Sequence, residues 1–303
     1  MSTTSPLKAE KFKSGCVAII GRPNVGKSTL VNLLLDFRLS IITPKPQTTR
    51  NRILGILSGE DFQIIFYDTP GLLEPQYALH RAMVKAAKSA IEQSDVVLFL
   101  VEASAKTHPK DMAILADLKN VRKPVLLVIN KIDLVYKETI LPLVDAYRSK
   151  HEFKEIVPIS ALKNDNVDQL KKILIDSIPE GFPFYPADHI TEHPERFFVS
   201  EIIREKIFQN YGQEIPYSTA VVIDEFKDRV GAKDHIKARI VVEKQSQKGI
   251  IIGKGGAALK KIGQAARKDI EAFLGREVYL ELWVAVREKW RQKDTFLREF
   301  GYS

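Results

Sequence analysis

Residues 21–28 form a phosphate-binding pattern, because Gly21 is followed after four residues by Gly26, Lys27 and Ser28. Glycines let a loop wrap backbone N–H groups around a β-phosphate, and the start of a following helix adds partial positive charge. A lysine here reaches the β- and γ-phosphates, and a serine is a ligand for Mg²⁺. We expect the whole loop and the next residue to contact a nucleotide: Gly21, Arg22, Pro23, Asn24, Val25, Gly26, Lys27, Ser28 and Thr29.

A second group of residues follows a predicted buried strand, where Asp68 opens a short turn that ends in Gly71. From this place a carboxylate holds Mg²⁺ through a water molecule, and a glycine N–H bonds a γ-phosphate. A strand-end aspartate is common by itself, but downstream of a phosphate loop it indicates a nucleotide and magnesium site. The predicted nucleotide contacts therefore include Asp68, Thr69, Pro70 and Gly71, and Ser28 and Asp68 are predicted metal ligands.

A third group of residues selects the base. Asp133 closes the tetrapeptide that starts at Asn130, and its carboxylate can accept hydrogen bonds from the ring N–H and the amino group of guanine. Adenine lacks both donors, so it would leave the carboxylate unpaired. The stem of Lys131 can cover the ring, and a backbone N–H in the turn after the next strand can bond the guanine O6. The predicted base contacts are Asn130, Lys131, Asp133, Ser160, Ala161 and Leu162.

A separate glycine-rich turn, Gly253-Lys254-Gly255-Gly256, lies far downstream of these groups. Glycines lack a Cβ atom, so such a turn can approach a nucleic-acid backbone closely. The window from Lys244 to Lys268 holds seven basic residues and no acidic one, while apolar residues keep one helical face. One face can therefore pack while the other meets phosphates.

The elements that must position these groups form two predicted units. Short apolar runs alternate with amphipathic stretches up to Pro179, which predicts an α/β domain with a mostly parallel sheet and helices on both faces. An edge hairpin is expected where 53–57 meets 62–67. The predicted strands are 16–20, 53–57, 62–67, 96–101, 125–129 and 156–159, and the predicted helices are 27–35, 77–93, 109–118, 140–150 and 167–178.

A proline-rich stretch from Pro179 separates this unit from a second one, in which helices surround a small sheet that we expect to be antiparallel. The predicted domains are residues 10–179, a linker over 180–196, and an α+β domain over 197–303. The stretch 287–300 predicts an amphipathic C-terminal helix that docks on its own domain, while contact with a membrane or a ribosomal protein stays open. The other predicted elements are helices 195–210 and 257–273 and strands 219–226, 238–243 and 278–286.

Composition narrows the classes of protein that fit. The 303 residues carry 46 basic and 38 acidic side chains, a formal charge of +8 that suits a polyanionic partner. Residues 181–303 hold only 21 of the basic and 18 of the acidic residues, so local arrangement matters more than the total. The single cysteine, the absence of a signal-peptide core and apolar runs far below ~20 residues predict a soluble, cytoplasmic protein without disulfides.

The nucleotide motifs over residues 15–178 resemble those of a translation-factor-class GTPase domain, and the segment 46–51 is similar to the switch segment of the Era family. This resemblance implies a P-loop GTPase in which Thr48 or Thr49 closes on Mg²⁺ and the γ-phosphate; the residues leave open which. The Gly-x-x-Gly turn resembles that of a type II KH domain. The pairing of the two units is similar to the Era family over about residues 10–300.

That resemblance implies a GTP-hydrolysing switch in assembly of the small (30S) ribosomal subunit, with GTP, GDP and the 3′ region of 16S rRNA as partners. It also implies some peripheral contact with the inner face of the cell membrane. No DNA partner is expected, and the protein is expected to be a monomer. The implied contacts to single-stranded RNA are Lys248, Ile251, Ile252, Gly253, Lys254, Gly255, Gly256, Lys260 and Lys261.

The residue after Gly71 departs from Ras-like enzymes, which place a water-orienting glutamine there. This chain has Leu72, which cannot form a side-chain hydrogen bond. In related families an asparagine at the position of Asn24 helps to hold K⁺, which supplies positive charge to the transition state. The predicted catalytic residues are Lys27, Asn24, Thr48, Thr49 and Gly71, with Mg²⁺ as cofactor and K⁺ as a second candidate.

Two other classes of function stay in view. In the first, the chain is a membrane-surface signalling GTPase whose basic C-terminal domain binds anionic lipid; lipid binding has no need of the Gly-x-x-Gly turn. In the second, it is a metabolic P-loop kinase, which the guanine-selecting tetrapeptide at Asn130–Asp133 disfavours.

Overall fold

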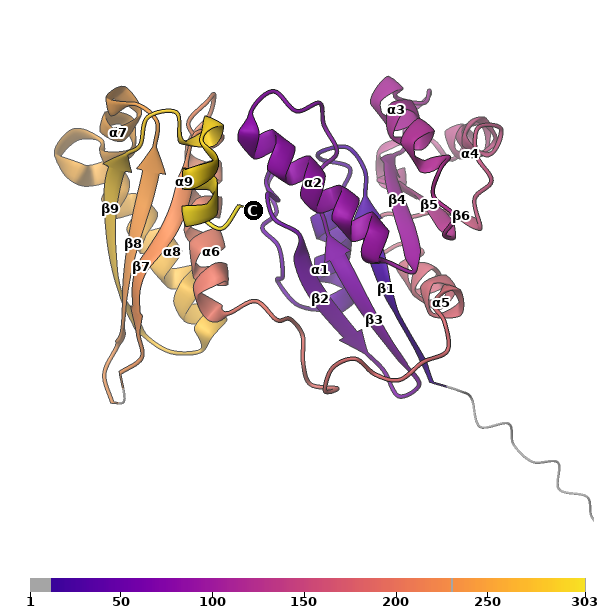
Figure 1. Ribbon diagram of the computed structural model, residues 1–303, viewed down its shortest axis with the longest axis horizontal. Helices are drawn as coiled ribbons and strands as arrows, with labels where there is room; N and C mark the ends of the chain where they lie inside the picture. The colour runs from indigo at the N-terminus through magenta and orange to yellow at the C-terminus, as the bar shows by residue number, and fades with distance from the viewer. Residues whose placement is uncertain (1–11, 230, 303) are drawn as a thin grey trace, which may run out of the picture.

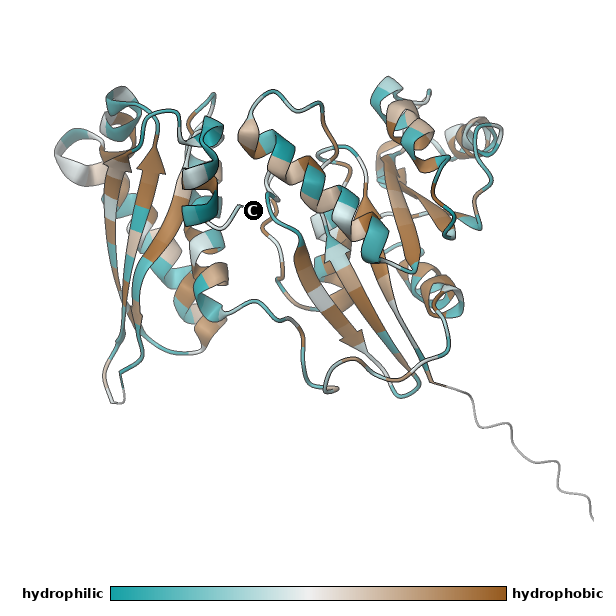
Figure 2. Ribbon diagram, viewed as in Figure 1, coloured by the Kyte–Doolittle hydropathy of each residue, from teal (hydrophilic) through white to brown (hydrophobic). Residues whose placement is uncertain are grey.

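The computed structural model describes residues 12–229 and 231–302, so residues 10 and 11 of the predicted first domain and residues 230 and 303 of the second lie outside the described residues. The chain forms two sheets, each with its own helices, that stand side by side (Figure 1). The strands of both sheets are largely hydrophobic (Figure 2), as expected of sheets buried against helices.

The first sheet has six strands in the order β2-β3-β1-β4-β5-β6. All neighbours pair in parallel except β2, which pairs antiparallel with β3 at one edge. The predicted edge hairpin is thus confirmed. The strands are β1 (Lys13–Ile20), β2 (Ile53–Ser58), β3 (Phe62–Asp68), β4 (Val96–Glu102), β5 (Val125–Asn130) and β6 (Glu155–Pro158).

Helices cover both faces of this sheet, which confirms the predicted α/β class. Helices α1 and α5 pack on one face, and α2, α3 and α4 pack on the other. Because β1, β3 and β5 are parallel, the loops that follow them meet at one edge of the sheet. The helices are α1 (Lys27–Leu35), α2 (Ala78–Gln93), α3 (Pro109–Leu118), α4 (Ile140–Arg148) and α5 (Val167–Ser177).

The stretch from Pro179 to Pro194 is irregular and lies along the first domain (Figure 1). The carbonyl of Pro179 accepts a hydrogen bond from Ser14 N at 3.0 Å, and the carbonyl of Ile190 accepts one from Ile56 N on edge strand β2 at 2.7 Å. Helix α6 begins at Glu195, so the last two residues of the predicted linker, 195 and 196, are helical.

The second domain is an α+β unit in which three helices pack on one face of the sheet β7-β8-β9. The expectation of a purely antiparallel sheet is wrong, because β8 and β9 pair in parallel. Two helices connect β8 to β9, and such a crossover returns the chain in the same direction. The elements are α6 (Glu195–Asn210), β7 (Ala220–Lys227), β8 (Asp234–Val242), α7 (Gln245–Ile252), α8 (Ala257–Leu274) and β9 (Val278–Val286).

The C-terminal segment is less helical than predicted and docks differently. It forms a short 3-10 turn at Trp290–Gln292 and a helix, α9 (Asp294–Glu299), because Lys289 adopts a left-handed backbone with φ +54° that interrupts a longer helix. Trp290 is fully buried in a cluster that includes Met83 of α2. The segment therefore joins the two domains rather than covering its own alone.

Candidate nucleotide and RNA sites

The phosphate loop turns sharply between β1 and α1. Gly26 has φ +100°, and a Cβ atom there would lie 2.2 Å from the side-chain nitrogen of Asn130, so this position requires glycine. Lys27 begins α1, and its Nζ donates to the carbonyls of Gly21 at 3.2 Å and Arg22 at 3.0 Å. Burial lowers the pKa of Lys27 to about 8. The loop thus holds a desolvated cation among its own carbonyls.

Three oxygen-bearing side chains meet beside this lysine. Ser28 Oγ donates to Asp68 Oδ2 at 2.8 Å and lies 3.0 Å from Thr49 Oγ1. The other carboxylate oxygen, Asp68 Oδ1, is buried without a hydrogen-bond partner among the described residues, and burial raises the pKa of Asp68. Hard oxygen donors of this kind suit Mg²⁺, and the unpartnered oxygen is available to a metal-bound water.

The two predicted switch threonines face different surroundings. Thr49 is buried beside Ser28, whereas the backbone carbonyl of Thr48 accepts a hydrogen bond from Arg204 of α6. The hydroxyl of Thr49, and not that of Thr48, is therefore the one that the structure brings to the oxygen cluster.

A cavity of about 570 Å³ lies over the phosphate loop. Its walls are the phosphate loop, the segment between α1 and β2, and Gly71. A Cβ atom at Gly71 would lie 2.6 Å from Pro23 N, so the two loops touch only because position 71 is glycine. The cavity brings together these predicted residues: Arg22, Pro23, Asn24, Gly26, Lys27, Ser28, Thr29, Thr48, Thr49, Gly71 and Lys131.

Three of the predicted phosphate-side residues have side chains that pack into the fold. Thr69 is fully buried, and its hydroxyl donates to the carbonyl of Ile19 at 2.6 Å, so its side chain is engaged within the domain and a contact of this residue with nucleotide stays a prediction. The side chain of Val25 is also fully buried. Pro70 is buried as well, so only the backbone of this turn faces the loop.

Asn130 connects the phosphate loop to the base-selecting residues. It is 2% exposed, and its side chain donates to Val25 O at 2.8 Å while accepting from Ala161 N at 2.9 Å. The N–H that was predicted to bond guanine O6 through Ala161 is therefore engaged by Asn130. Asn130 acts as a brace that holds both loops together.

The remaining base-selecting residues differ in exposure, and Ser160 is buried beside the exposed Asp133. Asp133 is exposed, and its Oδ1 accepts a hydrogen bond from Ser160 Oγ at 2.5 Å, which orients the carboxylate. Lys131 Nζ lies 3.1 Å from Glu102 at the cavity wall, and Leu162 is 75% exposed. Asp133, Ser160 and Leu162 do not line the cavity over the phosphate loop.

Two acidic residues of the site were missed by the sequence analysis. Arg22 Nε lies 3.1 Å from both carboxylate oxygens of Asp111, which is fully buried on α3, and Arg22 also lies 3.6 Å from Glu102. These contacts fix the guanidinium of Arg22 beside α3 and the end of β4. Neither Asp111 nor Glu102 belongs to a sequence motif, so their contacts with Arg22 can be recognised only in the folded structure.

The Gly-x-x-Gly turn joins α7 to α8 with three glycines in left-handed conformations: Gly253 at φ +71°, Gly255 at +59° and Gly256 at +80°. Beside it a groove of about 410 Å³ runs between α8 and β9. Its lining combines apolar Leu259, Leu280 and Leu282 with the basic side chains of Lys260 and Arg267. Lys254 and Lys261 are also exposed near the turn, and Lys248 is half-buried.

The prediction that Ile251 lines a groove for bases is wrong, and the same prediction for half-buried Ile252 stays a prediction. Ile251 is fully buried in the core of the second domain, because it lies on the inward face of α7, and Ile252 packs against the same core. The residues that line the groove instead are Leu280 and Leu282, which alternate along β9. Their period of two places them on the helix-covered face of the sheet.

The loop between α1 and β2 also touches the second domain. Arg50 is buried and donates to the carbonyls of Thr219 at 2.7 Å, Pro216 at 3.0 Å and Tyr217 at 3.1 Å. Lys45 donates to the carbonyls of Phe208 and Tyr211 at the end of α6. The loop that carries Thr48 and Thr49 is thus held by both domains.

Comparison with known proteins also separates the chain into a GTPase domain and a KH domain. Residues 16–131 match the family described as 50S ribosome-binding GTPase, and residues 214–291 match the KH domain family. The chain is similar to a crystal structure of an Aquifex aeolicus Era variant bound to GDP·AlF₄⁻, at 46% identity and a TM-score of 0.92 over 96% of this chain and 100% of that one.

A second crystal structure, of Era with MgGDPNP and nucleotides 1506–1542 of 16S ribosomal RNA, is similar to the same degree. It shares 46% identity and a TM-score of 0.92 over 96% of this chain and 99% of that one. Similarity of this level over nearly the whole of both chains extends through both domains. The chain therefore belongs to the Era family of GTPases.

Proposed function

We propose that this chain is a GTP-driven switch that binds single-stranded rRNA of the small ribosomal subunit through its KH domain. The observation that carries the proposal is the joining of two sites by one loop. The loop between α1 and β2 supplies Thr49 to the oxygen cluster and Arg50 to the second domain. A change at the γ-phosphate that moves this loop would therefore also move contacts to the KH domain.

On this proposal Lys27 contacts the β- and γ-phosphates. Their negative charge favours the protonated form of Lys27, which burial disfavours. Ser28 and Thr49 hold Mg²⁺ directly and Asp68 holds it through water, since their oxygens already converge. Bound Mg²⁺ neutralises charge on the β- and γ-phosphate oxygens. The chain's own part is to orient the phosphates and to exclude water around them. The relative crystallised with MgGDPNP supports this metal.

Guanine selection is assigned to Asp133, whose carboxylate is held by Ser160, and to the stem of Lys131. The side chain of Asn130 ties this turn to the phosphate loop through its hydrogen bond to Val25 O. Asn130 therefore serves specificity as a positioning residue, without itself touching the base.

For hydrolysis we propose that K⁺ assists at Asn24. Leu72 packs against the core, so its side chain does not orient water. Asn24 has φ +67°, and its side-chain nitrogen donates to Pro44 O at 2.9 Å in the loop between α1 and β2. Its amide oxygen and neighbouring loop carbonyls are neutral oxygen donors of the type that K⁺ accepts.

The groove between α8 and β9 is the proposed site for single-stranded RNA. Its glycine turn lets a phosphate backbone approach, Lys254, Lys260 and Lys261 surround it with positive charge, and leucines supply an apolar floor. The relative crystallised with nucleotides 1506–1542 of 16S rRNA supports this ligand and the small subunit as partner.

Further proposals concern organisation and location. We propose the domain limits 10–179 and 197–303, a monomeric protein in the cytoplasm, and no DNA partner. Peripheral contact with the membrane is the remaining proposal about location. Among residues 12–229 and 231–302, no helix has the length and apolar character needed to cross a bilayer.

A reciprocal pair of variants tests the proposed function. Lys27→Ala removes the phosphate cation and is expected to abolish GTP hydrolysis. Gly255→Asp places a carboxylate at the glycine turn and is expected to lower the affinity for RNA 1506–1542 strongly while GTP hydrolysis continues. Lys150→Ala is the matched control for both assays, because Lys150 is exposed and lines neither the cavity over the phosphate loop nor the groove between α8 and β9. Unchanged RNA binding by Gly255→Asp would contradict the KH assignment.

A further inference from the structure

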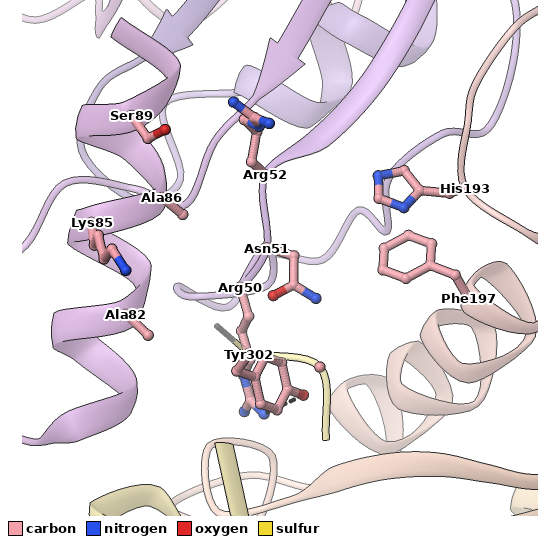
Figure 3. A pocket seen from close by; sticks show the side chains of 11 residues that line it. Arg50, Asn51, Arg52, Ala82, Lys85, Ala86, Ser89, His193, Phe197 and Tyr302 are labelled. Carbon is pink, nitrogen blue, oxygen red and sulfur yellow. Dashed lines mark hydrogen bonds between the residues drawn. The ribbon is translucent and has the colours of Figure 1, made fainter. Parts of the chain in front are cut away.

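We propose that the groove between α2 and the C-terminal domain is a second RNA-binding surface, which holds the phosphodiester backbone of single-stranded RNA without reading its sequence. The inference extends the proposed RNA-binding function to a site outside the KH groove. The groove has a volume of about 470 Å³ and lies between residues of α2 and residues from the start of α6 and the C-terminus (Figure 3).

The α2 side of this groove allows a chain to approach closely. Ala82, Ala86 and Ser89 line it at spacings of four and three, which places their small side chains on one face of the helix. None of the three projects far from the helix axis. A sugar-phosphate backbone can therefore lie near the helix without displacing large side chains.

Positive charge borders this small-residue floor. Arg52 and Lys85 line the groove, and buried Arg50 lies beneath it. Figure 3 shows Lys85 and Ser89 on α2 across the groove from His193 and Phe197. No acidic side chain lines the groove in the part of the chain that the structure describes.

The charge continues along the outer face of α2. Arg81, Lys85 and Lys88 are exposed at spacings of four and three, and among the described residues none of them forms an ion pair. A neighbouring hollow contains all three and shares Lys85 and Ser89 with the groove, so the surface is continuous. The sequence from residue 75 to residue 91 has no acid, and Glu92 ends the track.

The opposite wall supplies aromatic rings. His193 and Phe197 stack with centroids 4.3 Å apart and an interplanar angle of 22°, and both line the groove. Burial lowers the pKa of His193, so this ring is neutral at physiological pH and presents an uncharged face. Basic grooves with aromatic faces bind single strands with little sequence preference, because every base can stack.

The occupant that these observations favour is RNA rather than an anionic membrane. A helix that lies on a bilayer buries large apolar side chains between its cations. The exposed face of α2 has no large apolar side chain that is itself exposed; among described residues those lie on other elements. A concave surface with small residues suits a polymer backbone better than a flat lipid layer.

The test uses the full-length protein and poly(U) as a sequence-independent probe. In a Gly255→Asp background, which disables the KH turn, we expect poly(U) binding to persist. Combined Arg81→Gln, Lys85→Gln and Lys88→Gln should then remove most of it. The slope of log K against log salt should fall in magnitude by about 2, because each single-strand phosphate contact contributes about 0.7.

A matched control removes the same charge elsewhere on the first domain. Lys119→Gln, Lys137→Gln and Lys150→Gln change three exposed lysines that are remote from α2 in the sequence and should leave poly(U) binding nearly intact. Equal losses in both triple variants would overturn the proposal, because net charge alone would then explain the binding. Loss of all poly(U) binding in Gly255→Asp alone would also overturn it while leaving the KH assignment standing.

Two more readouts separate the remaining outcomes. Binding of RNA 1506–1542 that Gly255→Asp leaves unchanged would contradict the KH assignment, not the groove. If the α2 triple variant lost binding to phosphatidylglycerol vesicles but kept poly(U) binding, a membrane would replace RNA as the occupant and the proposal would be overturned.

Discussion

Lys27 is a cation that the fold has already taken out of water before a nucleotide arrives. Among the described residues, its ammonium group donates to the carbonyls of Gly21 and Arg22 alone, and burial lowers its pKa to about 8. A nucleotide triphosphate would supply several negative oxygens to the same place. Binding should therefore raise the pKa of Lys27 back toward the ordinary lysine value of about 10.4.

This shift predicts proton uptake on binding. At about pH 9, between the two pKa values, the empty protein holds Lys27 mostly neutral and the complex holds it charged, so binding takes up a proton. Titration calorimetry in two buffers of different ionisation enthalpy should give different heats at that pH. At about pH 7, where Lys27 is charged in both states, its contribution to the difference should vanish. Identical heats in both buffers at pH 9 would refute the assignment.

The lowered pKa of Lys27 also makes the free energy of unfolding of the nucleotide-free protein depend on pH. The folded pKa lies below that of the unfolded chain, so between about pH 8 and 10.5 the unfolded chain binds more protons at this residue. The free energy of unfolding contributed by Lys27 therefore rises with pH across that window. Below it, the burial penalty is fully present.

At the scale of elements, the loop between α1 and β2 both lines the cavity over the phosphate loop and contacts the KH domain. Asn24 donates to Pro44 of this loop at 2.9 Å, which leaves its amide oxygen free for a cation among the described contacts. We expect GTP turnover to be several-fold higher in potassium than in sodium. Asn24→Ala should remove that difference and lower the potassium rate to the sodium rate. Equal rates of the unaltered protein in both salts would rule out a role for K⁺.

The elements also show which features a sequence can predict. The P-loop, the strand-end Asp68 and the alternation of strands and helices are local, so their placement follows from short windows. The parallel pairing of β9 and the inward face of Ile251 depend on how a distant strand and helix pack, and the sequence analysis missed both. The Arg22–Asp111 pair was missed for the same reason, since its partners are far apart along the chain.

At the scale of the whole molecule, Arg50 is a buried polar link between the domains. Its guanidinium donates to three carbonyls of residues 216–219 and lies 5.9 Å from the centre of the Trp290 ring. None of these partners belongs to its own domain. A single side chain of the first domain thus completes the hydrogen bonding of a turn in the second.

Arg50→Met should undock the domains. It keeps much of the apolar contact but leaves buried carbonyls without donors, and each unsatisfied group costs about 1–3 kcal/mol. Differential scanning calorimetry is expected to resolve two transitions where the unaltered protein shows one. Arg148→Met, whose side chain is 69% exposed, is the control and should not change the number of transitions. A single, unshifted transition in Arg50→Met would show that the link is dispensable.

The segment that connects the two domains has only a short part that is not attached to the first domain. Its backbone and side chains are attached to β2 as far as Thr191 and His193, through Thr191 Oγ1 to Leu54 O at 2.6 Å and Leu54 N to His193 Nε2 at 3.4 Å. Helix α6 begins at Glu195, so Pro194 alone separates that attachment from a rigid element. An undocked C-terminal domain would therefore rotate about one residue instead of moving on a long flexible linker. Its effective concentration near the loop between α1 and β2 would stay high, so it could dock again by rotation alone.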